Sequence, residues 1–378
     1  MQPSHRTPGQ LIQELLEERG WTQNVLAVVL GCSKAAISMI IAGKRDIDAE
    51  MALMLAQVFD IPAERFMDLQ KSFELSRARI TTAVDPSLAR RAALFGTLPI
   101  AEMAKRGWIR VEDLKQVEQV EAAVAHFFRA DTAQNIPVLQ HAAKKTNATG
   151  SASPIQTAWL YRAKQIAEEM VVPRYSVEAL KQAIPRLSNL LSAPEEARHA
   201  PRILAEAGVR FLLVESLPNA KIDGACFWLS DASPVVAMAM RYDRIDNFWF
   251  VLRHEVEHVL QGHGRSSAMV DAELEGERAG VGQDVPEEER VANLAASAFC
   301  VPQKDLDSFI ARKSPFFAER DIIGFAAKRN IHPGLVAGQL RHRLKRWDLF
   351  AKHLVKIRFA VAPSATVDGW GDVAPVQQ

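Results

Sequence analysis

Apolar residues recur at helical spacing through the first seventy positions, and turn-forming residues interrupt them often enough to predict five short helices. The first should run from Pro8 to Arg19 and end at Gly20, because glycine readily adopts the left-handed conformation found after helices. The fifth should begin after Pro62. We therefore expect residues 1–71 to form one small helical domain.

The second and third of these helices have the spacing of a helix-turn-helix. Thr22 and Ser33 are suited to cap them, and Gly31 permits the sharp turn between them. Ile37 and Ile40 should face inward, which leaves the other side of the third helix free to enter a major groove. Lys44 and Arg45, which follow the third helix, could contact DNA phosphates. The predicted DNA-contacting residues are Ser33, Lys34, Ala35, Ser38, Met39, Lys44 and Arg45.

The charge of this domain does not by itself favour DNA. Residues 1–70 contain six Arg or Lys against nine Asp or Glu, a formal balance of −3. Phosphate contacts supply much of the affinity of DNA-binding proteins, so one copy should bind weakly and in a salt-sensitive way. We expect a homodimer that joins two half-sites, while a structural or protein-binding helical module remains an alternative.

The middle of the chain, residues 72–192, reads as helices without evident chemistry. The helical stretches are Ile100 to Arg106, Val111 to Arg129 and Thr157 to Met170, and residues 147–154 read as an exposed loop. This region could join the ends, bring subunits together or sense a ligand.

Residues 193–350 mix helices with a small sheet, so the whole chain is expected to be mainly α with some β (α+β). A helix should run from Pro194 to Ala207, and two or three more should follow Pro302. The tail, 351–378, is expected to end in a mobile segment. The predicted strands are Val209 to Val214, Ala225 to Leu229, Pro234 to Met240 and, as a late return to the sheet, Val355 to Ala360.

The composition is that of a globular protein of two or three cores, with 378 residues, 48% of them hydrophobic, and a net charge of +1. The cysteines, Cys32, Cys226 and Cys300, are few and widely spaced, which fits a reducing cytoplasm. We find neither a secretory signal nor an apolar stretch of about eighteen residues, so we expect a cytoplasmic protein without a membrane segment.

The main candidate for chemistry is the segment His254-Glu255-Val256-Glu257-His258, within a helix that Asp246 is expected to cap. Residues four apart project from one face of a helix, so His254 and His258 could bind Zn²⁺ together. Glu255 would lie beside the metal, placed to take a proton from water as general base. Burying two histidines is costly unless each is hydrogen-bonded or ligated, which favours the metal.

A catalytic zinc site needs a third protein ligand, and Glu289 is the best candidate. It lies in a helix bracketed by Pro286 and Pro302, and Asn293 follows one turn later, suited to support a ligating imidazole. The alternative is that Glu287, Glu288 and Glu289 only stabilise the N-terminus of this helix through its macrodipole. His263 is expected to be a helix-end residue instead of a ligand. The competing carboxylates, in a glycine-containing loop, are Asp271, Glu273, Glu275 and Glu277.

These residues resemble the ImmA/IrrE family of metallopeptidases over about residues 200–342. The resemblance implies a zincin-like α+β domain in which His254, His258 and Glu289 bind zinc and Glu255 is the general base. The sequence departs from the family pattern in two places. Glu257 replaces a small residue, and Val291 replaces a second glutamate that is common in the family.

Residues 6–71 resemble the XRE-type helix-turn-helix, and their amino-acid sequence is most similar to HigA-like antitoxins. The segments that show this similarity are Pro8-Gly9, Glu17 to Gln23, Gly43-Lys44-Arg45 and Leu69-Gln70.

The two resemblances together imply a DNA-binding regulator fused to a zinc-dependent endopeptidase that cleaves a protein partner or regulator, whereas the site residues alone predict only metal-assisted hydrolysis. Possible oxyanion donors are Arg241, Tyr242, His263 and His332. The alternative is an antitoxin or repressor whose metallopeptidase-like domain is a non-catalytic sensor or binds a toxin. A third interpretation is an antitoxin that neutralises a ribonuclease toxin by direct contact.

Overall fold

The protein is described from a computed structural model. Its contacts divide the chain into unit 1 (Met1–Leu88) and unit 2 (Ala89–Gln378), which are described separately. The described residues are 7–82, 85–132, 135–136, 152–265, 268–272 and 286–374. Most of the loop expected at 147–154, and Glu273, Glu275 and Glu277, lie outside them.

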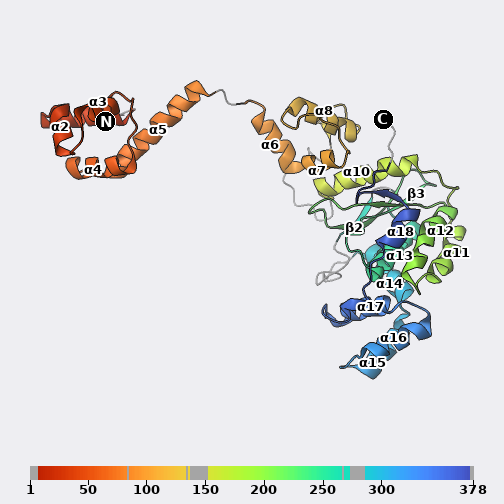
Figure 1. Ribbon diagram of the computed structural model, residues 1–378. Helices are drawn as coiled ribbons and strands as arrows, with labels where there is room; N and C mark the ends of the chain where they lie inside the picture. Colours follow the sequence, from red (N-terminus) through yellow and green to blue (C-terminus); the bar gives the residue numbers. More distant parts are fainter. Residues whose placement is uncertain are drawn as a thin grey trace. The chain divides into compact units, whose positions relative to one another are not determined.

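Unit 1 consists of the five predicted helices (Figure 1). The hydroxyls of Thr22 and Ser33 accept from the backbone N–H groups of Val25 and Ala36, so both predicted caps are confirmed. The last helix continues through residue 71, where the sequence suggested a boundary. The helices are α1 (Pro8–Arg19), α2 (Gln23–Val29), α3 (Lys34–Ile41), α4 (Ala49–Phe59) and α5 (Ala63–Thr81).

The core of unit 1 depends on a close approach of α1 to α3. A Cβ atom on Gly9 would lie 2.3 Å from the carbonyl oxygen of Ile41, so only glycine fits there. Leu26 and Leu55 are buried in the resulting core together with Ile37 and Ile40, which the periodicity predicted to face inward.

Taken singly, no helix in the described parts of the chain is long and apolar enough to cross a membrane. Helices α2 and α3 reach that composition only as a pair, and they bend by 119° at the turn between them.

Unit 2 contains a five-stranded mixed sheet in the order β4-β2-β3-β1-β5. β1 is parallel to β3 and to β5, whereas β2 is antiparallel to β3 and to β4. With the surrounding helices, this sheet confirms the predicted fold class of mainly α with a small sheet. The strands are β1 (Arg210–Val214), β2 (Ile222–Trp228), β3 (Pro234–Met238), β4 (Met269–Ala272) and β5 (Thr366–Asp368).

The helices of unit 2 largely match the predicted ones, although the stretch expected from Val111 becomes helical only at Val117. They begin with α6 (Leu88–Thr97), α7 (Ile100–Lys105), α8 (Val117–Phe127), α10 (Pro154–Glu169), α11 (Val177–Ser188), the 3₁₀ helix η2 (Pro194–His199) and α12 (Ala200–Glu206). They continue with α13 (Ile245–Gln261), α14 (Glu287–Cys300), α15 (Gln303–Lys313), α16 (Glu319–Arg329), α17 (Pro333–Leu344), η3 (Ala351–His353), α18 (Arg358–Val361) and η4 (Ala362–Ser364).

One predicted strand is wrong. Residues 355–360 do not join the sheet, because the carboxylate of Asp243 accepts hydrogen bonds from the backbone N–H groups of Ile357 and Arg358 at 3.0 and 2.7 Å. These bonds satisfy donors at the start of α18, which forms in place of a strand. The strand beside β1 comes later, at Thr366–Asp368.

The sheet separates two apolar layers, and β1 shows how the sequence builds both. Phe211 and Leu213 belong to the apolar cluster that contains α12 and α13 on one face, whereas Leu212 and Val214 belong to the cluster that contains α10 on the other. In Figure 1 the strands accordingly lie between α10 and α13. The indole N–H of Trp159 in α10 donates to the carbonyl oxygen of Val214 at 3.0 Å and ties its helix to the sheet.

A buried ion pair between Arg162 of α10 and Asp368 of β5 joins the same layers. Their side chains are only 4% and 1% exposed. Burial raises the pKa of Asp368, and the Arg162 guanidinium opposes that rise.

Asp368→Ala would leave the Arg162 cation buried without its carboxylate, so we expect the free energy of unfolding to fall by about 3–5 kcal/mol. Urea denaturation followed by fluorescence measures this change. The control is Glu206→Ala, which removes an ion pair with Arg186 whose side chains are about half exposed and should change stability little. Equal effects of the two substitutions would contradict the prediction.

Candidate metal centre

Helix α13 positions the predicted site and is buried from Ile245 to Val259 except at Phe250. The predicted Asp246 cap is wrong: the helix already starts at Ile245, and the Asp246 carboxylate instead accepts from the Arg244 guanidinium at 3.0 and 2.6 Å. This ion pair satisfies the aspartate within the first turn. The helix ends at Gln261 and is capped by Gly262, which has a φ of 73°.

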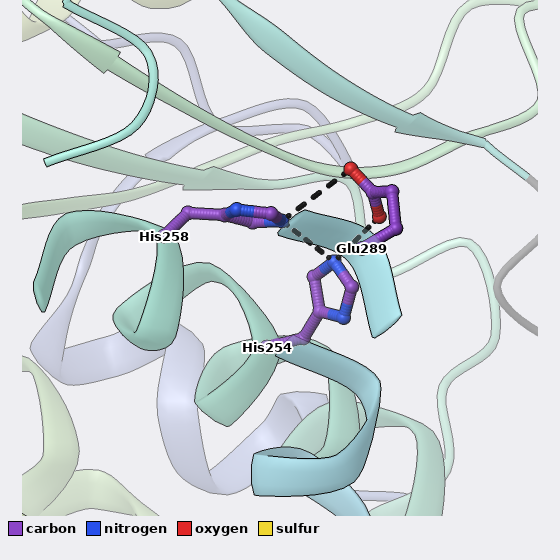
Figure 2. A group of neighbouring side chains, drawn as sticks. All are labelled: His254, His258 and Glu289. Carbon is purple, nitrogen blue, oxygen red and sulfur yellow. Dashed lines mark hydrogen bonds and ion pairs between the residues drawn. The ribbon is translucent and has the colours of Figure 1, made fainter. Parts of the chain in front are cut away.

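The structure brings together His254, His258 and Glu289. The Nε2 atoms of the two imidazoles lie 3.0 Å apart. The Glu289 carboxylate, carried by α14, lies 3.3 Å from Nε2 of His254 and 3.6 Å from Nε2 of His258. Figure 2 shows the rings and the carboxylate directed toward one another. These residues form a group that could hold a metal ion.

The three separations fit a tetrahedral metal ion. Metal–ligand distances of about 2.0–2.1 Å place neighbouring ligand atoms of a tetrahedral site about 3.3 Å apart, close to the mean of the observed distances. Two imidazoles with one carboxylate are also a donor set found in catalytic zinc sites, which leave a fourth position open. The residues therefore fit a metal both by geometry and by donor type.

The surroundings of Glu289 favour its ionised form, which is the form that binds a metal. Burial by itself would raise its pKa, but hydrogen bonds with His254 and His258, together with the charges of those imidazoles, lower the pKa well below its usual range. The helix approach that allows this contact comes from small residues, since Ala292 and Ala296 are fully buried.

The carboxylate of Glu255 is fully buried and packs against strand β2. A Cβ atom on Gly224 would lie 2.2 Å from Oε1 of Glu255 and 3.0 Å from its Cδ. Gly224 therefore leaves the space that the carboxylate occupies. The predicted general base follows the first ligand directly on α13 and lies against the sheet.

Glu257 forms interactions along its own helix. Its carboxylate accepts from the Arg253 guanidinium at 2.7 Å and from the Gln261 amide at 2.6 Å. Burial would raise the pKa of Glu257, but these bonds and the charge of Arg253 lower it. The extra charge is thus paired with Arg253.

The other candidates make contacts within their own parts of the fold. His332 caps α17, because its Nδ1 accepts from the backbone N–H of Gly334 at 3.0 Å. Arg241 stacks over the ring of Tyr242, 4.8 Å from its centroid. Asn293 lies one turn after Glu289 and is half-buried, and the described part of the chain shows no side-chain hydrogen bond for it.

A contact that the sequence did not suggest involves His263. Its Nδ1 lies 3.0 Å from Nδ1 of the ligand candidate His258. The expected place just beyond the helix end is confirmed. The pattern that could have indicated the contact is a glycine followed by histidine at the end of the motif helix.

In unit 1, the predicted DNA-contacting residues lie on the exposed side of α3 and in the turn after it. All seven are exposed: Ser33, Lys34, Ala35, Ser38, Met39, Lys44 and Arg45. Ile37 and Ile40 are buried beneath them.

A family model described as helix-turn-helix matches residues 12–66. The chain is also 31% identical over 88 residues to the HTH-type transcriptional regulator YddM of Escherichia coli (strain K12), a match that covers 23% of this chain and 92% of that protein. The chain therefore belongs to the helix-turn-helix family of transcriptional regulators.

Two solved structures from Pseudomonas aeruginosa are similar, each at 30% identity and a TM-score of 0.20. One is PA4674 in complex with its operator DNA, covering 23% of this chain and 98% of that one. The other is the antitoxin HigA with the higBA promoter, covering 22% and 97%.

Gly224→Ala should force the Glu255 carboxylate or strand β2 to move, and we expect it to destabilise unit 2 by about 1–3 kcal/mol through overpacking. Chemical denaturation measures the change. The matched control is Gly324→Ala in α16, where an added Cβ meets nothing within 4 Å, so stability should stay constant or rise by about 0.5–1 kcal/mol. A neutral Gly224→Ala would refute the close contact.

Proposed function

We propose that this protein is a DNA-binding transcriptional regulator that carries a zinc-dependent endopeptidase. The observation that carries the enzymatic part is the convergence of His254, His258 and Glu289 on one point, with Glu255 following the first ligand. The resemblance to ImmA/IrrE metallopeptidases supports a protein as the substrate class.

His254, His258 and Glu289 would hold the zinc ion. When bound, zinc polarises a carbonyl oxygen and makes a water molecule more acidic. The Glu255 carboxylate then accepts a proton from the attacking water and later delivers it to the nitrogen of the leaving amine. Its position against Gly224 gives it a fixed orientation, so little rearrangement is needed before the proton transfer.

The DNA-binding part is proposed for the exposed side of α3. Ser38 and Met39 would face base edges, while Lys44 and Arg45 would contact phosphates. The formal charge of −3 over residues 1–70 limits the affinity of one copy, so we propose that a homodimer binds the operator. The second candidate function is a repressor or antitoxin whose domain holds a metal but is not catalytic. It differs from the first only because no substrate is cleaved.

The metal is tested by elemental analysis of the purified protein. We expect about one zinc per wild-type chain, and a loss of at least about tenfold in zinc affinity for His258→Ala and Glu289→Gln, since each removes a ligand. Glu287→Gln is the control, because this neighbour is exposed and pairs with Arg290. Wild-type protein that binds no zinc would refute the metal site.

Catalysis is tested with Glu255→Gln, which should keep zinc but cleave a protein encoded beside this chain at least about 100-fold more slowly. The readout is the appearance of cleavage fragments over time. If the variant cleaves as fast as the wild type, Glu255 is not the general base. If the zinc-loaded wild-type protein cleaves none of the proteins encoded by the neighbouring genes, the non-catalytic alternative is favoured.

DNA binding is tested by gel-shift titration with the DNA upstream of this reading frame at several salt concentrations. Lys44→Ala and Arg45→Ala should each reduce the slope of log affinity against log salt by about 2, because each removes one phosphate contact from both copies of the homodimer. The control is Arg65→Ala, which changes an exposed residue of α5, outside helices α2 and α3 and the turn that follows them. Equal affinity for unrelated DNA would contradict an operator.

A further inference from the structure

The end of helix α13 folds back so that the residue after Gly262 meets the last turn. Gly262 has a φ of 73°, and the backbone N–H of His263 donates to the carbonyl oxygen of His258 at 2.9 Å. This is the Schellman arrangement, in which the side chain two positions past the helix lies beside the one in its last turn. Here the two side chains are imidazoles.

The position of His263 is fixed from the other side by strand β2. The indole N–H of Trp228 donates to the carbonyl oxygen of His263 at 2.7 Å, and the Cys226 thiol lies 3.8 Å from the same oxygen. The side chain of His263 is only 20% exposed. Backbone and strand therefore hold the ring against His258 independently of any metal.

We propose that His263 is a positioning residue that fixes the tautomer and orientation of the ligand His258, an inference that rests on the proposed metal site. A ligating Nε2 carries no proton, so neutral His258 must carry its proton on Nδ1. That N–H donates to Nδ1 of His263, 3.0 Å away. His263 consequently accepts at Nδ1 and carries its own proton on Nε2, which faces the carboxylate of Glu288 at 3.9 Å.

The competing explanation is that His263 only fills space at the helix end. Packing alone does not select which atoms of the two rings touch. Here a nitrogen of one ring lies at hydrogen-bonding distance from a nitrogen of the other. A partner on the far nitrogen of a ligating histidine both orients the ring and raises its basicity. The two explanations differ in what an acceptor at this position should do.

The test compares His263→Asn, whose amide oxygen can take the place of Nδ1 as acceptor, with His263→Phe, which keeps a ring but has no acceptor. Zinc affinity is measured at one pH by competition with a chromophoric chelator. We expect affinity to fall about 10–100-fold in His263→Phe and to stay within about threefold of wild type in His263→Asn. His126→Phe on α8 is the control for an unspecific loss of histidine.

Unchanged affinity in His263→Phe would overturn the proposal, and so would an equal loss in both variants, which would indicate packing alone. Wild-type protein without zinc would instead refute the proposed metal site, and this inference with it. If His263→Phe fails to fold, ¹⁵N–¹H correlation spectra of zinc-loaded wild type with labelled histidine decide. The proton of His263 should be found on Nε2, and a proton on Nδ1 would overturn the proposal.

Discussion

Two imidazoles inside a helix that is buried along most of its length are the constraint on which unit 2 depends. Neither ring can reach water, so each must find partners among the side chains that enclose the helix. Glu289 supplies one partner to both rings, and His263 supplies another to His258. The packing of α14, the strand β2 and the end of α13 can be understood as the means of bringing those partners in.

The close approaches around α13 all occur at residues without bulk. Gly224 makes room for the carboxylate of Glu255. A Cβ atom on Gly338 of α17 would lie 2.6 Å from the Cβ atom of Asp246, so glycine is needed there as well. Ala292 and Ala296 serve the same purpose on α14. Because each contact is at van der Waals limits, the polar groups of this region are held in one arrangement.

What the sequence could predict was mostly local. The helix caps of unit 1 join residues three positions apart, and the histidine pair lies one turn apart, so periodicity and spacing were sufficient. Glu289 was within reach because its helix follows α13 and presents small residues to it. The short helix at 358–361 was missed because it depends on Asp243, far away in the chain. The contact of His263 with His258 was missed because it depends on the left-handed Gly262, which turns the backbone in a way that helical periodicity does not describe.

The position of β5 has a consequence for how the chain reaches its folded state. The core of unit 1 is built only from residues of unit 1 itself. This unit can therefore fold while the rest of the chain is being synthesised. Unit 2 cannot complete its sheet until Thr366–Asp368 are available to pair with β1 and Asp368 can meet Arg162. Until then β1 has an unpaired edge and the guanidinium of Arg162 has no carboxylate. A ribosome-bound or newly released chain therefore passes through a stage in which the unit proposed to bind DNA is folded and the unit with the proposed metal ligands is not.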